Sequence, residues 1–169
     1  MNNYSRLHNY IDSNDWESAI DYLLLEVEKD YDDVNASINL IYCLGIFLTE
    51  MDISATTREK YTKISIEYFR RANEHFVNNP IFLFYAGFMI CIGEWNFGVE
   101  DYYGNTMIDR AYNLCPTCFL YKWSLYQNGP HQAAEGYLRE LREYCLSFGY
   151  SFILEHGPIG DYIIDCFHL

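Results

Sequence analysis

The chain has 169 residues and a formal net charge of −13, half of its residues are hydrophobic, and it contains 17 Tyr, 11 Phe and 3 Trp. The length suits one domain, and the apolar content excludes a disordered chain, which would lack the apolar area that offsets the entropy lost on ordering. The acidic charge argues against a nucleic-acid-binding protein, because such proteins need Lys and Arg to displace counterions from phosphates.

Hydropathy and cysteine usage bear on the compartment. The longest apolar run, residues 81–93, has 13 residues, whereas a membrane-spanning helix needs about 20, so we expect a buried helix there. No charged segment followed by an apolar segment opens the sequence, so we expect no secretion signal. The six cysteines lie mostly in apolar helical runs, as reduced cysteines do in cytosolic proteins. We therefore expect a cytoplasmic protein that does not enter a membrane.

Apolar residues recur at helical spacing along the whole chain, with turn residues between the segments and no alternating strand pattern. The predicted helices cover residues 16–27, 34–48, 57–76, 81–93, 103–114, 119–126, 131–148 and 161–169. Asp15 or Asn14 is the predicted N-cap of the first helix, and Thr56 or Thr57 is that of the third. The segment Asn78-Asn79-Pro80 ends the third helix, because the residue before proline leaves the helical region. This series predicts an all-α fold.

Residues 14–22 read Asn-Asp-Trp-Glu-Ser-Ala-Ile-Asp-Tyr. They resemble the Gly-Asp-Tyr-Glu-Glu-Ala-Ile-Glu-Tyr junction of the tetratricopeptide repeat, a pair of antiparallel helices that stacks on its neighbours. Residues 65–80 look like its second helix and the turn that follows. Leu44-Gly45 and Ala86-Gly87 look like the Leu-Gly pair of its first helix, where a glycine permits close approach of the neighbouring helix.

The resemblance implies an all-α, tetratricopeptide-like stack of about four antiparallel helix pairs with a C-terminal capping helix. The single helical-repeat domain, residues 1–169, would then consist of degenerate repeats over residues 1–148 and a cap over residues 149–169. Each pair buries its apolar face only by stacking on the next pair. Proteins of this family bind other proteins far more often than they catalyse reactions.

Charge is distributed unevenly along the sequence. Residues 12–33 contain nine acidic residues and one basic residue, Lys29, whereas residues 58–71 are mainly basic. The acidic segment is either a solvated face or a docking surface that steers a basic partner at a high association rate. On the second interpretation, its candidate partner-binding residues are Asp12, Asp15, Glu17 and Asp21.

Residues 95–104, Trp-Asn-Phe-Gly-Val-Glu-Asp-Tyr-Tyr-Gly, form an insertion relative to the repeat pattern. Insertions in repeat arrays map to loops on one face, often the binding face, and Trp and Tyr dominate interface hot spots. The further candidate partner-binding residues are therefore Trp95, Glu100, Asp101, Tyr102 and Tyr103. The alternative is that the aromatic side chains, Trp95 and Phe97 above all, fold back onto the core.

No motif in the sequence carries chemistry by itself. Cys115-Pro-Thr-Cys118 is a lone CxxC without the second ligand pair of a zinc site, and it stands where the repeat family has a turn between repeats. The five histidines are scattered, and no phosphate-binding glycine loop or nucleophile motif occurs. We therefore expect no catalytic residue, no metal and no cofactor, and a protein that is not an enzyme.

The repeat register predicts an inner row of large apolar side chains. Its members are Tyr42, Ile46, Phe84, Phe88, Phe119, Trp123 and Tyr126. A row of this size must be covered, because monomers rarely expose so large an apolar patch. Either the C-terminal segment or a helix of a partner covers it, and we favour the C-terminal segment. Its apolar residues are Phe152, Ile153, Leu154, Ile163, Ile164 and Phe167.

In its size, its acidity and its lack of catalytic motifs, the chain resembles the small acidic immunity proteins that neutralise bacterial toxins, many of which are basic nucleases. We therefore expect a cytoplasmic inhibitor that binds a basic protein, such as a toxin domain, and covers its substrate site. The alternative is an adaptor that holds a peptide or helix in the aromatic groove. The sequence leaves the oligomeric state open.

Overall fold

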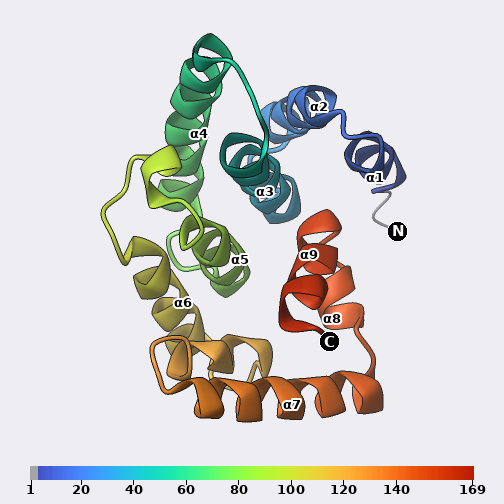
Figure 1. The fold of residues 1–169 in the computed structure, drawn as a ribbon, viewed down its shortest axis with the longest axis vertical. Helices are drawn as coiled ribbons and strands as arrows, with labels where there is room; N and C mark the ends of the chain where they lie inside the picture. The colour runs from blue at the N-terminus through green and yellow to red at the C-terminus, as the bar shows by residue number, and fades with distance from the viewer. Residues whose placement is uncertain (1–3) are drawn as a thin grey trace.

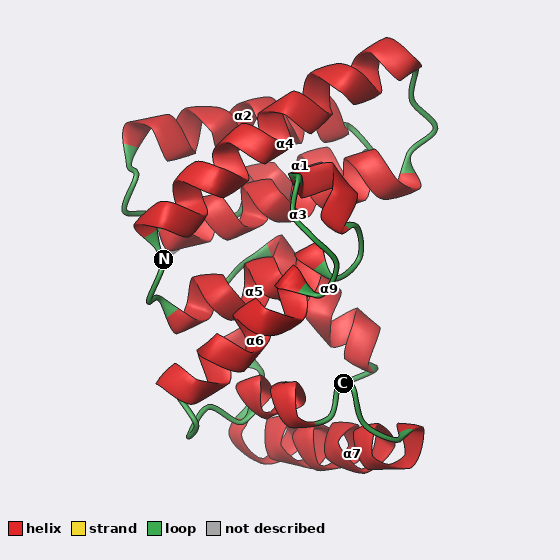
Figure 2. Ribbon diagram, turned by 90° about the vertical axis from the view of Figure 1, so that its left-hand side faces the viewer, coloured by secondary structure: helices red, strands yellow, loops and turns green. Residues whose placement is uncertain are grey.

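The computed structural model describes residues 4–169, and this part of the chain is all-α, with no strand (Figure 2). The helices are α1 (Ser5–Asp12), α2 (Trp16–Lys29), α3 (Val34–Glu50), α4 (Ala55–His75), α5 (Pro80–Ile90), α6 (Tyr103–Leu114), α7 (His131–Phe148), α8 (Ser151–Leu154) and α9 (Pro158–Phe167). Two 3₁₀ helices, η1 (Glu94–Phe97) and η2 (Leu120–Leu125), lie between them. The all-α prediction is confirmed.

Side-chain caps determine where the first long helices begin. The side chains of Asp15, Asp33 and Asn79 accept hydrogen bonds from backbone N–H groups in the first turns of α2, α3 and α5. Such bonds satisfy N–H groups that have no partner within the helix. The prediction of Thr56 or Thr57 as the cap of α4 was wrong. Ser54 is the cap, and its Oγ accepts a hydrogen bond of 3.1 Å from the backbone N–H of Thr57.

Helices α3 and α5 form the centre of the molecule (Figure 1). Helix α3 packs against α2, α4 and α5, and α5 packs against α6. All residues of α3 from 36 to 48 are buried, which explains why this segment has no polar face. Gly87 and Gly104 let α5 and α6 approach closely, because a Cβ on Gly87 would lie only 2.9 Å from the carbonyl oxygen of Gly104. The expected role of the Ala86-Gly87 pair is thus confirmed.

The C-terminal segment turns back onto the stack. Helix α7 lies across one end, and α8 and α9 then return toward α3 (Figure 1). The ring of Phe167 contacts Phe88 at 5.4 Å and Trp123 at 5.1 Å between centroids. Tyr162 contacts Tyr42 at 5.2 Å. The prediction that the C-terminal segment covers the inner aromatic row is therefore confirmed for this part of the row.

The far end of the row has a different cover, which the sequence did not indicate. Tyr137 of α7 stacks on Phe119 and Tyr126, with ring centroids 5.9 and 5.0 Å apart. The Tyr137 hydroxyl also donates a hydrogen bond of 2.8 Å to the backbone oxygen of Leu120. Helix α7 thus packs on η2 through aromatic stacking.

No helix within residues 4–169 is both long and apolar enough to cross a membrane.

Candidate protein-binding site

Two of the predicted acidic residues near the N-terminus have roles within the chain. Asp15 caps α2, with its Oδ1 3.2 Å from the backbone N–H of Ser18. The Glu17 carboxylate accepts a hydrogen bond of 3.0 Å from the hydroxyl of Tyr61, a buried residue of α4. Asp12 and Asp21 are exposed, and their side chains form no hydrogen bond or ion pair with another described residue.

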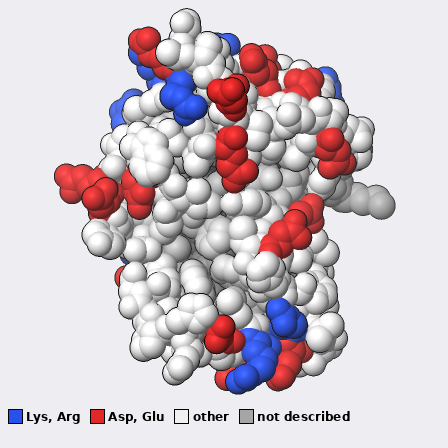
Figure 3. Space-filling model, in the orientation of Figure 1, with Lys and Arg blue, Asp and Glu red and all other residues white. Residues whose placement is uncertain are grey.

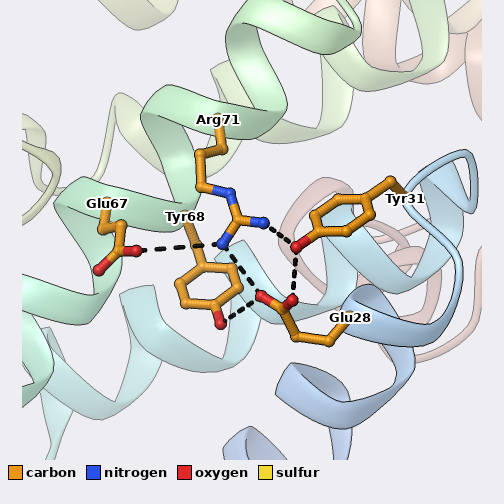
Figure 4. A network of polar contacts seen from close by, with 5 residues as sticks. All are labelled: Glu28, Tyr31, Glu67, Tyr68 and Arg71. Atoms are coloured by element: carbon orange, nitrogen blue, oxygen red, sulfur yellow. Dashed lines mark hydrogen bonds and ion pairs between the residues drawn. The ribbon is translucent and has the colours of Figure 1, made fainter.

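Two further carboxylates of this segment, Glu28 and Asp32, contact the basic helix α4, and Asp32 lies 2.7 Å from His75. Glu28 accepts hydrogen bonds from Tyr31, from Tyr68 at 2.8 Å and from Arg71 at 3.0 Å (Figure 4). These hydrogen bonds lower the pKa of Glu28 below its ordinary value, and the bond from Tyr31 has the largest effect. Burial and the hydrogen bond to Glu28 raise the pKa of Tyr68 to about 12. The Glu28 carboxylate, which looked available in the sequence, is therefore paired with side chains of α4.

The second candidate region is the acidic-aromatic loop, residues 91–102, between α5 and α6. Its middle is fixed to the core by Phe97, which is 2% exposed and packs on Phe69 of α4 with ring centroids 5.8 Å apart. Asn96 is also buried, and its amide donates a hydrogen bond of 3.1 Å to Thr49 of α3. The Ser65 hydroxyl donates a hydrogen bond to the Asn96 carbonyl oxygen. The loop is thus held against α3 and α4 at its centre.

Two aromatic side chains of this loop point away from the core. Trp95 is 67% exposed and Tyr102 is 72% exposed. Tyr102 has a φ of +68°, a left-handed conformation that costs a bulky residue about 1–3 kcal/mol and persists only where its surroundings impose it. Its carbonyl oxygen accepts a hydrogen bond of 3.1 Å from the N–H of Thr106 in the first turn of α6. The fold thus holds an exposed aromatic ring on a fixed backbone.

Tyr103, the neighbouring predicted residue, lies in a different environment. It is half-buried, and its ring packs edge-on against Phe69 with centroids 6.2 Å apart. Its hydroxyl accepts a hydrogen bond of 2.9 Å from the amide of Asn73. Tyr103 therefore joins α6 to α4, while Tyr102 faces solvent.

A polar hollow of about 360 Å³ lies beside Tyr102. It is lined by Cys91, Glu94, Asp101, Tyr102, Asn105, Gln127 and Asn128. This lining contains two carboxylates and no Lys or Arg. Figure 3 shows a group of Asp and Glu side chains at the edge of the molecule where Figure 1 draws this loop. The hollow therefore has the polarity to accept a cationic side chain.

Cysteine chemistry is not favoured in this hollow. Burial, with a smaller effect of Glu94, raises the pKa of Cys91 to about 11, so the group is a thiol at neutral pH. The thiol donates a hydrogen bond of 3.1 Å to Asn105.

Burial likewise raises the pKa of Cys118 in the CxxC segment, and a thiol is a much weaker nucleophile than a thiolate. Residues 4–169 contain no group of three or more His, Cys, Asp or Glu side chains arranged to hold a metal ion.

The structure thus separates the predicted site residues into three groups. The first group is exposed on the acidic-aromatic loop and consists of Glu100, Asp101, Trp95 and Tyr102. Tyr103 is half-buried and packs on α4. The acidic residues near the N-terminus lie on another part of the surface, on α1 and α2. Sequence reasoning missed Gln127 and Asn128, because the turn after η2 reaches the hollow only through the packing of η2 on α6.

Comparisons with known proteins give no relative from which a function can be carried over. No protein-family model matches the chain, and no curated protein and no solved structure matches it either.

Proposed function

We propose that this protein is a non-catalytic, cytoplasmic protein-binding module that recognises a basic protein through the acidic-aromatic loop. The observation that carries the proposal is the combination of two exposed aromatic residues, Trp95 and Tyr102, with the adjacent carboxylates of Glu100 and Asp101. Trp and Tyr provide large contact areas at low entropic cost, and they dominate the energetics of protein interfaces.

The geometry of the loop supports a specific mode of recognition. Trp95 and Tyr102 would pack on the surface of the partner, with the backbone of the loop already fixed by Phe97 and Asn96. A Lys or Arg of the partner would enter the polar hollow, where Asp101 pairs with its charge and the ring of Tyr102 offers a cation–π contact. The net charge of −13 would steer the approach of such a partner.

The proposed architecture is a tetratricopeptide-like stack. The order of helices and the packing of α3 on α2, α4 and α5 support this interpretation, as does the close approach of α5 and α6 at Gly87. In this arrangement the loop between α5 and α6 is an insertion at the edge of the stack, a position that repeat proteins often use for binding.

Within this proposal, the protein acts as an inhibitor similar in character to a toxin immunity protein. Binding would cover the cationic substrate site of a basic target, such as a nuclease domain, without any chemistry by the inhibitor. The adaptor alternative requires an open inner groove. Phe167 and Tyr162 already occupy part of that groove, and Tyr137 covers Phe119 and Tyr126, so the packing favours the inhibitor.

The test is affinity capture from the native cell with the full chain as bait and a salt gradient for elution. We expect one basic protein in a one-to-one ratio, released at moderate salt. The double variant Trp95→Ala/Tyr102→Ala should lose this protein. Phe148→Ala removes an aromatic ring that is also 72% exposed, at the end of α7, and it should retain the partner. A partner held equally by all three baits would refute the proposed site.

A further inference from the structure

The C-terminal hairpin, residues 151–167, packs on α3, α5 and η2, touches α1 through Asp161 and α7 through Phe152, and is joined to α7 by one linker. Its helices α8 and α9 bury Ile153, Ile159 and Ile163, each 0% exposed. Gly149 joins it to α7 with a φ of +84°, and a Cβ built at this glycine would meet nothing within 4 Å. No side chain therefore packs around the linker at Gly149.

Polar contacts around one histidine join this hairpin to α3. Asn39 is fully buried; its amide group donates a hydrogen bond of 2.8 Å to the His156 carbonyl oxygen and accepts one of 3.2 Å from the N–H of Ile159. The His156 ring is 5% exposed and lies 4.6 Å from the Tyr85 ring between centroids. Its Nδ1 lies 2.8 Å from the side-chain oxygen of Asn35, to which it donates a hydrogen bond.

The surroundings of His156 favour its neutral form. Helix α3 contributes only amide groups there, and α5 contributes Tyr85, whose pKa is raised by burial so that its hydroxyl stays neutral. Within residues 4–169 the one charged neighbour is Glu155, whose Oε1 is 3.8 Å from His156 Nε2 and whose side chain is 64% exposed. Because Nδ1 already carries its hydrogen toward Asn35, a second proton must bind Nε2, where no acceptor of a described residue lies within hydrogen-bond distance. Burial, only partly offset by Glu155, lowers the pKa of His156.

We propose that His156 is a proton-operated latch: protonation of Nε2 releases the C-terminal hairpin from α3 and uncovers the inner aromatic row. In the released state the imidazole is hydrated, and its pKa returns to the ordinary value of about 6.5. The attached state binds the proton more weakly, so attachment weakens as pH falls below about 6.5 and is constant above that value. Release would also break the contact between His8 of α1 and Asp161, which are 2.8 Å apart.

Release would uncover a surface with defined chemistry. Phe167 leaves Phe88 and Trp123, and Tyr162 leaves Tyr42, so aromatic side chains on α3, α5 and η2 become accessible together. The latch thus controls the groove that the adaptor alternative would need, and it does not depend on the function proposed for the acidic-aromatic loop.

The test is hydrogen exchange of the full chain at pH 7.5 and pH 5.5, with rates corrected for the intrinsic effect of pH. We expect the protection of amides in α9 to fall by up to about tenfold between pH 7.5 and 5.5, while amides in the middle of α3 keep their protection. Unchanged protection of α9 would overturn the proposal, and so would a parallel loss in α3 and α9, since that would be global unfolding.

Two variants identify the responsible group. His156→Gln keeps a donor toward Asn35 but cannot take up a proton, so protection of α9 should no longer depend on pH. Glu155→Gln alters only an exposed side chain and removes the charge that favours protonated His156 in the attached state, so release at pH 5.5 should increase. His131→Gln, at an exposed histidine of α7, is the matched control and should behave like the wild type. If His156→Gln does not fold, Glu155→Gln decides: release equal to that of the wild type would refute the latch.

Discussion

The two acid-rich regions of this protein differ in what their carboxylates contact. In the N-terminal region, residues 12–33, Asp15 and Asp33 cap helices, and Glu28 is held by Tyr68 and Arg71 of α4. In the acidic-aromatic loop, Glu100 and Asp101 are exposed and form no hydrogen bond or ion pair with the other described side chains. The region with more acidic residues thus offers a smaller share of them to a partner.

The aromatic residues of the two regions differ in the same way. The hydroxyls of Tyr31 and Tyr68 both donate hydrogen bonds to Glu28 (Figure 4). The guanidinium group of Arg71 makes a cation–π contact with the Tyr31 ring. Trp95 and Tyr102 instead present their side chains to solvent. The number of carboxylates in a sequence segment therefore does not show how many are available for binding. That depends on whether each carboxylate contacts other groups of the fold.

The largest stability effect that follows from this comparison concerns the cap of α3. Asp33→Ala removes hydrogen bonds to the backbone N–H groups of Asn35 and Ala36, at 2.9 and 3.0 Å, and should cost about 1–2 kcal/mol in the free energy of unfolding. Asp101→Ala in the loop should change it by less than about 0.5 kcal/mol. Urea denaturation of both variants measures the difference. Equal losses would show that the two regions do not differ as described.

Charge reversal in the loop should have the next largest effect, on binding kinetics. Glu100→Lys/Asp101→Lys should slow association with the captured basic partner by about tenfold at low salt and reduce the salt dependence of the rate. Asp12→Lys/Asp21→Lys, a matched change of two exposed carboxylates on α1 and α2, should slow association less. Surface plasmon resonance at several salt concentrations gives both rates. A greater effect of the N-terminal pair would move the binding surface to α1 and α2.

The smallest effect is the pH-dependent contribution of Glu28. Because its folded pKa is lowered, the Glu28 carboxylate stabilises the fold above its ordinary pKa of about 4.5, and this contribution disappears as pH falls through the lowered value. Glu28→Gln should therefore lower stability at pH 7, by at most about 1 kcal/mol because the ion pair is partly exposed, and should match the wild type near pH 3. Denaturation curves at both pH values provide the comparison. A difference that persists at pH 3 would mean that the amide disturbs packing instead.

Part of this structure followed from local patterns in the sequence. Apolar spacing predicted helices α2 to α7 and α9, since periodicity depends only on neighbouring residues. It did not predict the short helices α1 and α8, and the helix predicted over residues 119–126 is the 3₁₀ helix η2. The mainly apolar character of residues 36–48 and the uninterrupted apolar run 81–90 agree with the burial of α3 and α5 at the centre. The covering of Phe88 and Trp123 by the C-terminal segment followed from the need to bury a large apolar surface.

The remainder depended on how distant segments dock. The pairing of Glu28 with Arg71 joins residues 43 positions apart, and the bond between Asn39 and His156 spans 117 positions. Neither is visible in a local pattern. Tyr102 and Tyr103 are adjacent, yet the left-handed backbone at Tyr102 directs one ring to solvent while the other packs on Phe69. The exposure of each aromatic residue in the loop therefore required the structure.

The measurement that tests the central claim most directly is the dissociation constant of the complex between the captured partner and each of four forms of this protein. These are the wild type, Trp95→Ala, Tyr102→Ala and Phe148→Ala, measured by isothermal titration calorimetry. Interface anchors cost at least about 2 kcal/mol when truncated, so each loop variant should bind about thirtyfold more weakly or worse, whereas Phe148→Ala should bind like the wild type. Wild-type affinity in both loop variants would contradict the assignment of the acidic-aromatic loop as the binding surface.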